Sequence, residues 1–221
     1  MAILEARSVG KLYRTEGSTV AALADVSLAV EPGHFIALVG RSGCGKSTLL
    51  NLCGAMDFPT SGEIRIDGQS TSALNDAALT RLRRQKVGFI FQSFQLLHTL
   101  TAIENVELPL LLAHQPSARQ TAAERLRWVE MDGLADRFPH QLSGGQQQRI
   151  AIARALAHNP LLILADEPTG NLDTITGDLV LDLLRRTATE FSVAVIMATH
   201  SAESASMVDR VVKMRDGRLE S

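Results

Sequence analysis

The chain has 221 residues, of which 45% are hydrophobic and 21% charged, and its formal net charge at pH 7 is −2. These values are ordinary for one globular domain with a substantial core, and they exclude extensive disorder. Because 24 acidic residues balance 22 basic ones, bulk charge does not favour nucleic acid, and we expect no nucleic-acid partner.

Two cysteines, Cys44 and Cys53, are too few for a disulfide framework or a four-cysteine metal site. The N-terminal residues lack the apolar run of a signal peptide. The longest apolar stretches, such as 110–113 and 193–198, are far shorter than the ~20 residues that cross a bilayer. We therefore expect a soluble protein, so that work at a membrane would require another chain to span it.

The N-terminal region shows an alternating pattern. Val26, Leu28 and Val30 form one alternating series, and Ile64 and Ile66 form another. A period of two is typical of strands with one buried and one exposed face. The region is therefore predicted to contain an antiparallel β layer.

Four compact apolar runs, over 35–39, 87–91, 161–165 and 193–198, predict strands that are buried on both faces. Residues 93–160 are mainly helical in pattern, with helices over 121–129 and 146–157, bounded by Pro139 and by Gly144 and Gly145. Residues 210–219 predict a hairpin that turns at Asp216 and Gly217.

Together these patterns predict one α/β domain over 1–221 with a largely parallel sheet. The core with its β layer is expected over about 1–92 and 161–221. A helical lobe is inserted over about 93–160.

A glycine-rich segment follows the first buried strand. It fits the P-loop pattern of glycine, four residues and then Gly-Lys-Ser/Thr: Gly40, Arg41, Ser42, Gly43, Cys44, Gly45, Lys46, Ser47 and Thr48. Its backbone N–H groups and the following helix N-terminus suit a phosphate. Lys46 can reach the β- and γ-phosphates, and the Ser47 hydroxyl can coordinate Mg²⁺. The alternative, a turn with an incidental lysine, does not account for the strand and helix on either side.

Two acids end the run over 161–165. Asp166 is suited to hold Mg²⁺ through a water, and Glu167 can polarise the water that attacks the γ-phosphate. The alternative is that both acids cap the helix after Pro168, which would be preferred if no P-loop preceded them.

A Leu-Ser-Gly-Gly-Gln sequence spans residues 142–146, and alone it is a turn before a helix. Combined with the P-loop and the Asp-Glu pair, it makes the chain resemble the ATPase subunits of ABC transporters over nearly its whole length. The resemblance implies a P-loop NTPase core of the ABC type with ATP and Mg²⁺ as cofactors. It also implies that two copies form an ATP-dependent homodimer. In this dimer the signature residues of one copy contact the nucleotide bound to the other copy: Ser143, Gly144, Gly145 and Gln146.

The same resemblance implies roles for four further residues. Tyr13, upstream of the first β layer, matches the aromatic that stacks on adenine, and Gln92 matches the glutamine that touches Mg²⁺ and the attacking water. Asp173 lies in the loop that crosses the dimer interface, and His200 matches the γ-phosphate switch histidine. The alternatives are a surface tyrosine and a structural strand-end histidine.

Residues 89–97, 100–109 and 168–173 look like the lipoprotein-release and macrolide-export group, which includes haem-efflux ATPases, although His34 and His98 depart from its pattern. This implies an ATP-hydrolysing subunit on the cytoplasmic face of the cell membrane, held there by integral-membrane permease subunits. Residues 92–109 are expected to receive the permease, in a groove formed by Phe91, Phe94, Leu96, Leu97 and Leu100. The substrate would be hydrophobic or amphipathic, such as a lipoprotein, macrolide, peptide or haem.

Three other functions are possible. A soluble ABC ATPase of chromosome maintenance or translation usually carries a coiled-coil insertion or a second cassette, which 221 residues do not accommodate. A small-molecule P-loop kinase has no use for a signature loop supplied by a second copy. A catalytically silent scaffold does not fit a chain that keeps Lys46, Asp166, Glu167 and His200.

Overall fold

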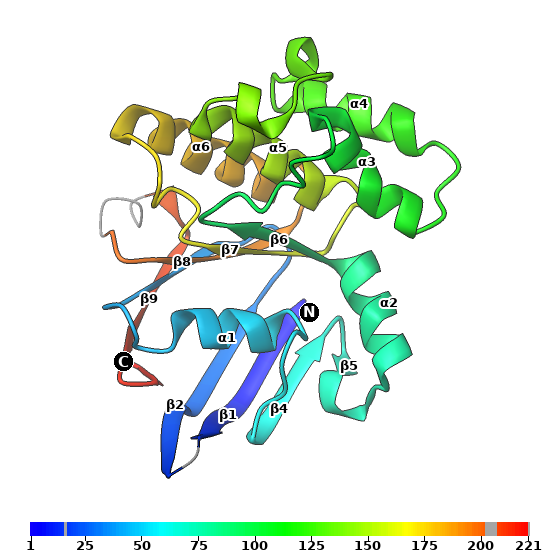
Figure 1. Ribbon diagram of the computed structural model, residues 1–221. Coiled ribbons are helices and arrows are strands. Elements are labelled where there is room, and N and C mark those ends of the chain that lie inside the picture. Colours follow the sequence, from blue (N-terminus) through cyan, green and yellow to red (C-terminus); the bar gives the residue numbers. More distant parts are fainter. Residues whose placement is uncertain (16, 202–206, 221) are drawn as a thin grey trace.

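The computed structural model describes residues 1–15, 17–201 and 207–220 and has a mixed α/β architecture (Figure 1). Its strands are β1 (Leu4–Thr15), β2 (Ser18–Val30), β3 (Phe35–Val39), β4 (Ser61–Ile66), β5 (Gln69–Ser70), β6 (Val87–Phe91), β7 (Leu162–Asp166), β8 (Ala194–Thr199), β9 (Arg210–Arg215) and β10 (Arg218–Leu219). Its α-helices are α1 (Lys46–Cys53), α2 (Asp76–Lys86), α3 (Ala102–Leu112), α4 (Ala118–Trp128), α5 (Gly144–Leu156) and α6 (Thr174–Glu190).

The larger sheet has the order β10-β9-β3-β8-β7-β6, and all its pairs are parallel except the β9–β10 hairpin. Phe35 and Ala37 of β3 pack toward the cluster that contains α3 to α6, whereas Ile36 and Leu38 pack toward α1 and the N-terminal strands. Burial on both faces explains why these strands are apolar throughout. The prediction of a largely parallel sheet is confirmed, with β7 and β8 each beginning one residue later than expected.

The smaller sheet has the order β2-β1-β4-β5 and is antiparallel. Its inward residues are buried. Leu4 of β1, for example, lies opposite Val30 of β2 and Ile66 of β4, and all three side chains belong to the core. The predicted antiparallel layer is therefore confirmed. The sequence analysis placed Tyr13 upstream of this layer, which is wrong, because Tyr13 lies within β1.

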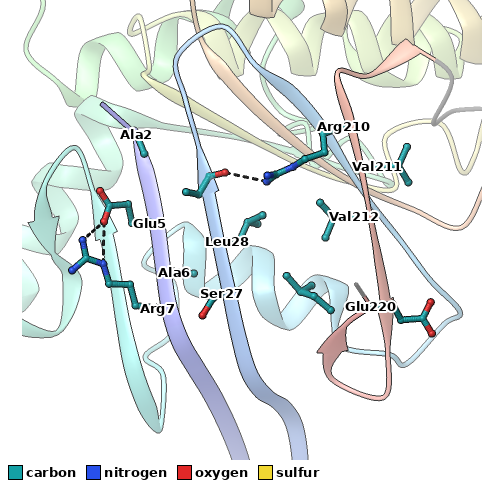
Figure 2. Close-up of a pocket in the computed structure, with 12 residues that line it drawn as sticks. Ala2, Glu5, Ala6, Arg7, Ser27, Leu28, Arg210, Val211, Val212 and Glu220 are labelled. Carbon is teal, nitrogen blue, oxygen red and sulfur yellow. Dashed lines mark hydrogen bonds and ion pairs between the residues drawn. The ribbon is translucent and has the colours of Figure 1, made fainter.

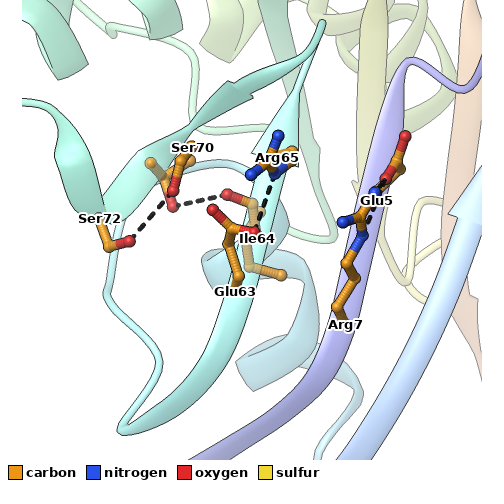
Figure 3. A network of polar contacts seen from close by, with 8 residues as sticks. Glu5, Arg7, Glu63, Ile64, Arg65, Ser70 and Ser72 are labelled. Atoms are coloured by element: carbon orange, nitrogen blue, oxygen red, sulfur yellow. Dashed lines mark hydrogen bonds and ion pairs between the residues drawn. The ribbon is translucent and has the colours of Figure 1, made fainter.

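The outward face of this sheet carries alternating charges (Figure 3). Glu5 lies opposite Arg65, and Arg7 lies opposite Glu63, so unlike charges face each other across β1 and β4. Within each strand, Arg7 pairs with Glu5, and Arg65 donates to Glu63 at 2.8 Å. Water and salt screen such exposed pairs, so they keep the face solvated and add little to stability.

A cavity of about 560 Å³ lies between the two sheets, lined by β1, β2, β9 and the C-terminal residues (Figure 2). Arg210 crosses it and donates to the carbonyl of Ala29 at 3.0 Å. The Ala24 amide also donates to the carbonyl of Gly217 at 2.8 Å. These bonds join the C-terminal hairpin to β2, and none of the sequence motifs reaches this cavity.

The helices of residues 93–160 cover one side of the parallel sheet together with α6 (Figure 1). Helix α5 begins at Gly144, two residues earlier than predicted, because Ser143 caps it and accepts from the Gln146 amide. Pro139 begins a short 3₁₀ turn instead of bounding an α-helix. Helix α2 was not predicted, since Leu79 and Leu82 are its only buried residues among many charged ones.

Within the described residues, none of the helices combines the length and hydropathy that a membrane crossing requires.

Asn105 of α3 organises the turn that leads into this helix. Its side chain is fully buried, accepts from the Leu97 amide at 2.8 Å and donates to the carbonyls of Leu97, Leu100 and Thr101 at 3.0–3.1 Å. Asn105→Leu has a similar volume but removes the bonds that its side chain makes to the Leu97 amide and the Leu100 carbonyl, so we expect a loss of about 2–3 kcal/mol in the free energy of unfolding by urea. Asn75→Ala, which removes the cap of α2, should cost about 1 kcal/mol. Equal losses in the two variants would contradict this role for Asn105.

Candidate functional site

The P-loop connects β3 to α1 at the carboxyl edge of the parallel sheet. Gly45 is the N-cap of α1 and has a φ of 106°, a backbone angle that residues with a side chain rarely adopt. A Cβ at Gly45 would also lie 2.6 Å from the carbonyl oxygen of Ala22, so the N-terminal sheet packs directly against this turn. The amide of Cys44 donates to the carbonyl of Arg41 at 3.3 Å, which closes a turn inside the loop.

Lys46 is the first residue of α1, and its side chain folds back over the loop. Its Nζ donates to the carbonyls of Gly40 at 2.7 Å and Arg41 at 3.2 Å, and the residue is only 6% exposed. Burying an ammonium group is costly unless it is hydrogen-bonded. The loop therefore holds one cation at its centre, surrounded by backbone groups of residues 40–45.

Asp166 ends β7, the strand beside β8, and the Ser47 hydroxyl lies near its carboxylate. Burial raises the pKa of Asp166 above its usual value, whereas the Ser47 hydroxyl and the nearby Lys46 ammonium oppose this shift. A hydroxyl and a carboxylate are oxygen donors of the kind that Mg²⁺ prefers, and Mg²⁺ typically takes few protein ligands beside phosphates and waters. The residues present therefore fit this metal. Within the described ranges, no three His, Cys, Asp or Glu side chains gather as a dedicated metal cage.

Glu167 follows Asp166 with φ 46°, so the chain turns sharply after the strand. Its amide donates to the carbonyl of Ala198 at 3.0 Å, and its Oε2 lies 3.1 Å from Nδ1 of His200. The structure thus brings together two residues that are 33 positions apart. A cavity of about 240 Å³ beside them is lined by Glu167, Asp173 and His200, among others.

Gln92 directly follows β6, whose neighbour in the sheet is β7. Its side-chain Nε2 donates to Oδ1 of Asn171 at 3.2 Å, and Nδ2 of Asn171 donates to the carbonyl of Gln92 at 3.1 Å. This pair was not predicted. A contact between residues 79 positions apart leaves no local signal in one sequence.

The signature residues lie at the start of α5, where Ser143 and Gln146 form a reciprocal capping box. Asp173 caps α6 and accepts from Thr176, and these bonds hold the pKa of its carboxyl below the usual value. A Cβ at Gly145 would lie 2.2 Å from Cγ2 of Thr176, so the two helix starts touch. Within one copy, both side chains serve as helix caps.

Tyr13 lies on β1 beside the start of α1. Its hydroxyl donates to Asp57 at 3.0 Å, and the Lys11 ammonium lies 5.0 Å from its ring centre. Partial burial, together with Asp57, raises the pKa of Tyr13, whereas the Thr48 hydroxyl of the P-loop opposes the shift. Asp57, which the sequence analysis missed, fixes the phenol, while the residue stays 39% exposed.

The structure therefore places Lys46, Ser47, Asp166, Glu167, Gln92 and His200 along the carboxyl edge of neighbouring parallel strands, where open α/β sheets bind ligands. Tyr13 borders this edge from the other sheet. Gly144 and Gly145 of the signature sequence instead lie close to Phe94, Leu172 and Thr176.

A family model described as ABC transporter matches residues 23–170. The chain is 46% identical to the lipoprotein-releasing system ATP-binding protein LolD of Maricaulis maris, over 98% of this chain and 96% of that protein. It is 44% identical to the macrolide export ATP-binding/permease protein MacB of Syntrophobacter fumaroxidans, over 100% of this chain and 31% of that protein. The solved dimer of the Methanocaldococcus jannaschii cassette MJ0796, in a post-hydrolysis state bound to ADP and Pi, has a TM-score of 0.90 at 43% identity and covers 99% of this chain and 97% of that chain.

Proposed function

The chain belongs to the ABC transporter family as an ATP-binding subunit that hydrolyses ATP, and we propose that it drives a separate membrane permease as a two-fold pair of such subunits. The observation that carries this proposal is the shared sheet edge, which brings together the Lys46 ammonium, Ser47, Asp166 and the Glu167–His200 contact.

Each of these residues has a distinct part in binding and hydrolysis. The amides of the P-loop and the Lys46 ammonium bind the β- and γ-phosphates, so Lys46 exchanges its bonds to Gly40 and Arg41 for bonds to phosphate oxygens. Tyr13 stacks on the adenine. Ser47, Asp166 and Gln92 would hold Mg²⁺, which supplies charge neutralisation at the phosphates when bound.

Glu167 acts as the general base for the attacking water. When both ring nitrogens carry a proton, His200 can donate from Nδ1 to Oε2 of Glu167, which orients the carboxylate and leaves Oε1 for the water. The second ring nitrogen, Nε2, then donates to the γ-phosphate. This places the base and the phosphate sensor in one hydrogen-bonded unit.

The second copy completes the site. Ser143 and the first amides of α5 form a helix N-terminus that suits an anion, and within this chain the Ser143 hydroxyl serves to cap its own helix through Gln146. A two-fold partner would place its own residues 143–146 on the nucleotide held by Lys46. The pairing itself is supported by the similarity to MJ0796, which was solved as a dimer bound to ADP and Pi.

We place the permease contact in a groove of about 330 Å³ between β6, the end of α3 and the end of α5. It is lined by Val87, Gly88, Phe89, Phe91, Gln95, Leu108, Pro109, Leu112, Arg154, Ala155 and His158. Of the five apolar residues expected there, only Phe91 lines it. Leu96 is buried and Phe94 packs on the core cluster, while Leu97 and Leu100 lie outside the groove.

Two neighbouring leucines allow a matched test of this groove. Leu112 lines it and is 54% exposed, whereas Leu111 is 52% exposed and does not line it. Leu112→Glu should abolish co-purification with the permease and its stimulation of ATPase activity, because a carboxylate would be buried in an apolar contact. Leu111→Glu should keep both, and basal ATPase activity should be unchanged in either variant. Normal stimulation of Leu112→Glu would place the contact elsewhere.

The proposed cargo is a hydrophobic or amphipathic molecule that the permease exports or extracts, and the pair sits on the cytoplasmic face of the membrane. The support is the similarity to proteins named for lipoprotein release and macrolide export. The deciding experiment is to purify the complex from membranes with the tagged chain and measure phosphate release in detergent or nanodiscs. Phosphate release that needs a small-molecule phosphoryl acceptor would contradict the proposal.

A further inference from the structure

The contact between Gln92 and Asn171 determines the orientation of the side-chain amide of Gln92. Asn171 donates its Nδ2 to the backbone carbonyl of Gln92, so its Oδ1 is the atom that remains to face the glutamine side chain. That oxygen can only accept. The group opposite it must therefore be Nε2, at 3.2 Å, which leaves Oε1 of Gln92 free for another partner.

A flipped Gln92 amide would set two oxygens against each other at this distance. The Gln92 amide also lies close to Gly170, where a Cβ would be only 2.8 Å from Nε2, so the absence of a side chain at this position leaves room for the amide. The segment that carries Asn171 is itself held by turns: the Gly170 amide donates to the carbonyl of Glu167 at 3.0 Å, and the Leu172 amide donates to that of Thr169 at 3.1 Å. Asn171 is thus fixed relative to Glu167.

Both amides are exposed, so water competes for their hydrogen bonds and the pair adds little to stability. Its effect is on orientation. Of the atoms in a glutamine side chain, a hard cation such as Mg²⁺ binds the oxygen and not the amide nitrogen. An amide that presents Oε1 in most molecules binds the cation better than one that flips freely.

We propose that Asn171 is a positioning residue for Gln92, which holds the amide so that Oε1 faces the metal and the attacking water. This inference rests on the proposed role of Gln92 at Mg²⁺. Because Asn171 lies two residues before Asp173, in the loop expected to cross the dimer interface, it also joins that interface to the metal-facing glutamine.

The test is a double-mutant cycle in a Glu167→Gln background, so that ATP is not consumed during the measurement. Titration calorimetry gives the affinity for ATP with Mg²⁺ and with EDTA for four proteins: the background, Asn171→Ala, Gln92→Ala and the double variant. We expect each single variant to reduce the preference for Mg²⁺ by about 10-fold, in the range seen for residues that orient metal ligands. The double variant should lose no more than Gln92→Ala alone, and affinity in EDTA should not change.

A matched control is Asn159→Ala, which removes another asparagine amide that bonds across elements, to Arg125. It should keep the full preference for Mg²⁺. If Asn171→Ala lowers the thermal midpoint more than Asn159→Ala does, Asn171→Ser replaces it, since a shorter hydroxyl cannot make both bonds.

Three results would overturn the inference. Asn171→Ala could keep the parental preference while Gln92→Ala loses it, which would leave the role of Gln92 intact. The two losses could add in the double variant, in which case Asn171 acts independently of Gln92. Gln92→Ala could retain the preference, which would instead refute the proposed metal role of Gln92 and with it the positioning role.

Discussion

Lys46→Ala should lower the affinity for ATP by at least about 100-fold and reduce hydrolysis to background. The Lys46 ammonium is a buried cation at the centre of the loop, and two charge-assisted hydrogen bonds to phosphate are worth about 1.5–3 kcal/mol each. Tenfold in affinity corresponds to about 1.4 kcal/mol. Titration calorimetry with ATP and a phosphate-release assay measure the two effects.

The control is Lys86→Ala, which removes a lysine paired with Asp67 far from the P-loop. It should bind and hydrolyse ATP like the parent. Since Lys46 also bonds the carbonyls of Gly40 and Arg41, thermal midpoints should be compared, and we expect Lys46→Ala to stay folded. Unchanged nucleotide affinity in a folded Lys46→Ala protein would refute the assigned phosphate site.

The buried strands were the most predictable part of the fold. Residues of β3 and β6 are apolar on both faces because helices or the second sheet cover each side. Burial on both faces produces a continuous apolar run, which can be recognised in the sequence. Helix α2 shows the opposite case. Its stability depends on two leucines that reach the core and on the Asn75 cap. Two apolar residues among several charged ones are too few to show a helical period in the sequence.

Local motifs also identified the residues that the fold gathers at the sheet edge, because the P-loop and the strand-end acids owe their geometry to neighbours in sequence. The partners that orient side chains were not predictable. Asp57 for Tyr13 and Asn171 for Gln92 come from distant segments that the fold brings together. Ser143 and Asp173 cap helices within one chain, and this structural role alone is enough to explain why these residue types occur there. Their expected function therefore depends on a second copy.

Glu167→Gln should slow hydrolysis by at least about 100-fold while keeping ATP binding. The amide preserves the size of the side chain, and its oxygen can still accept from His200, so the shape of the site is retained. What is lost is the carboxylate that takes a proton from water, and such general-base groups contribute about 10²–10⁴-fold. Glu63→Gln, on the charged outer face of β4, is the matched control and should hydrolyse ATP normally. Hydrolysis by Glu167→Gln at the parental rate would show that Glu167 is not the base.

The same variant should collect as a closed dimer when ATP and Mg²⁺ are present. ATP would be held on one side by Lys46 and the P-loop and on the other by the partner's α5 N-terminus, so each bound nucleotide stabilises the pair. ADP lacks the γ-phosphate that reaches the second copy, and hydrolysis therefore shifts the population toward separate subunits. Size-exclusion chromatography with light scattering should give a dimer mass for Glu167→Gln with ATP and a monomer mass with ADP. Adding Ser143→Glu to this variant should restore the monomer, since a carboxylate would face the γ-phosphate while α5 keeps an acidic cap. If ATP never promotes pairing, even when the permease brings two copies together, the shared-site mechanism is wrong.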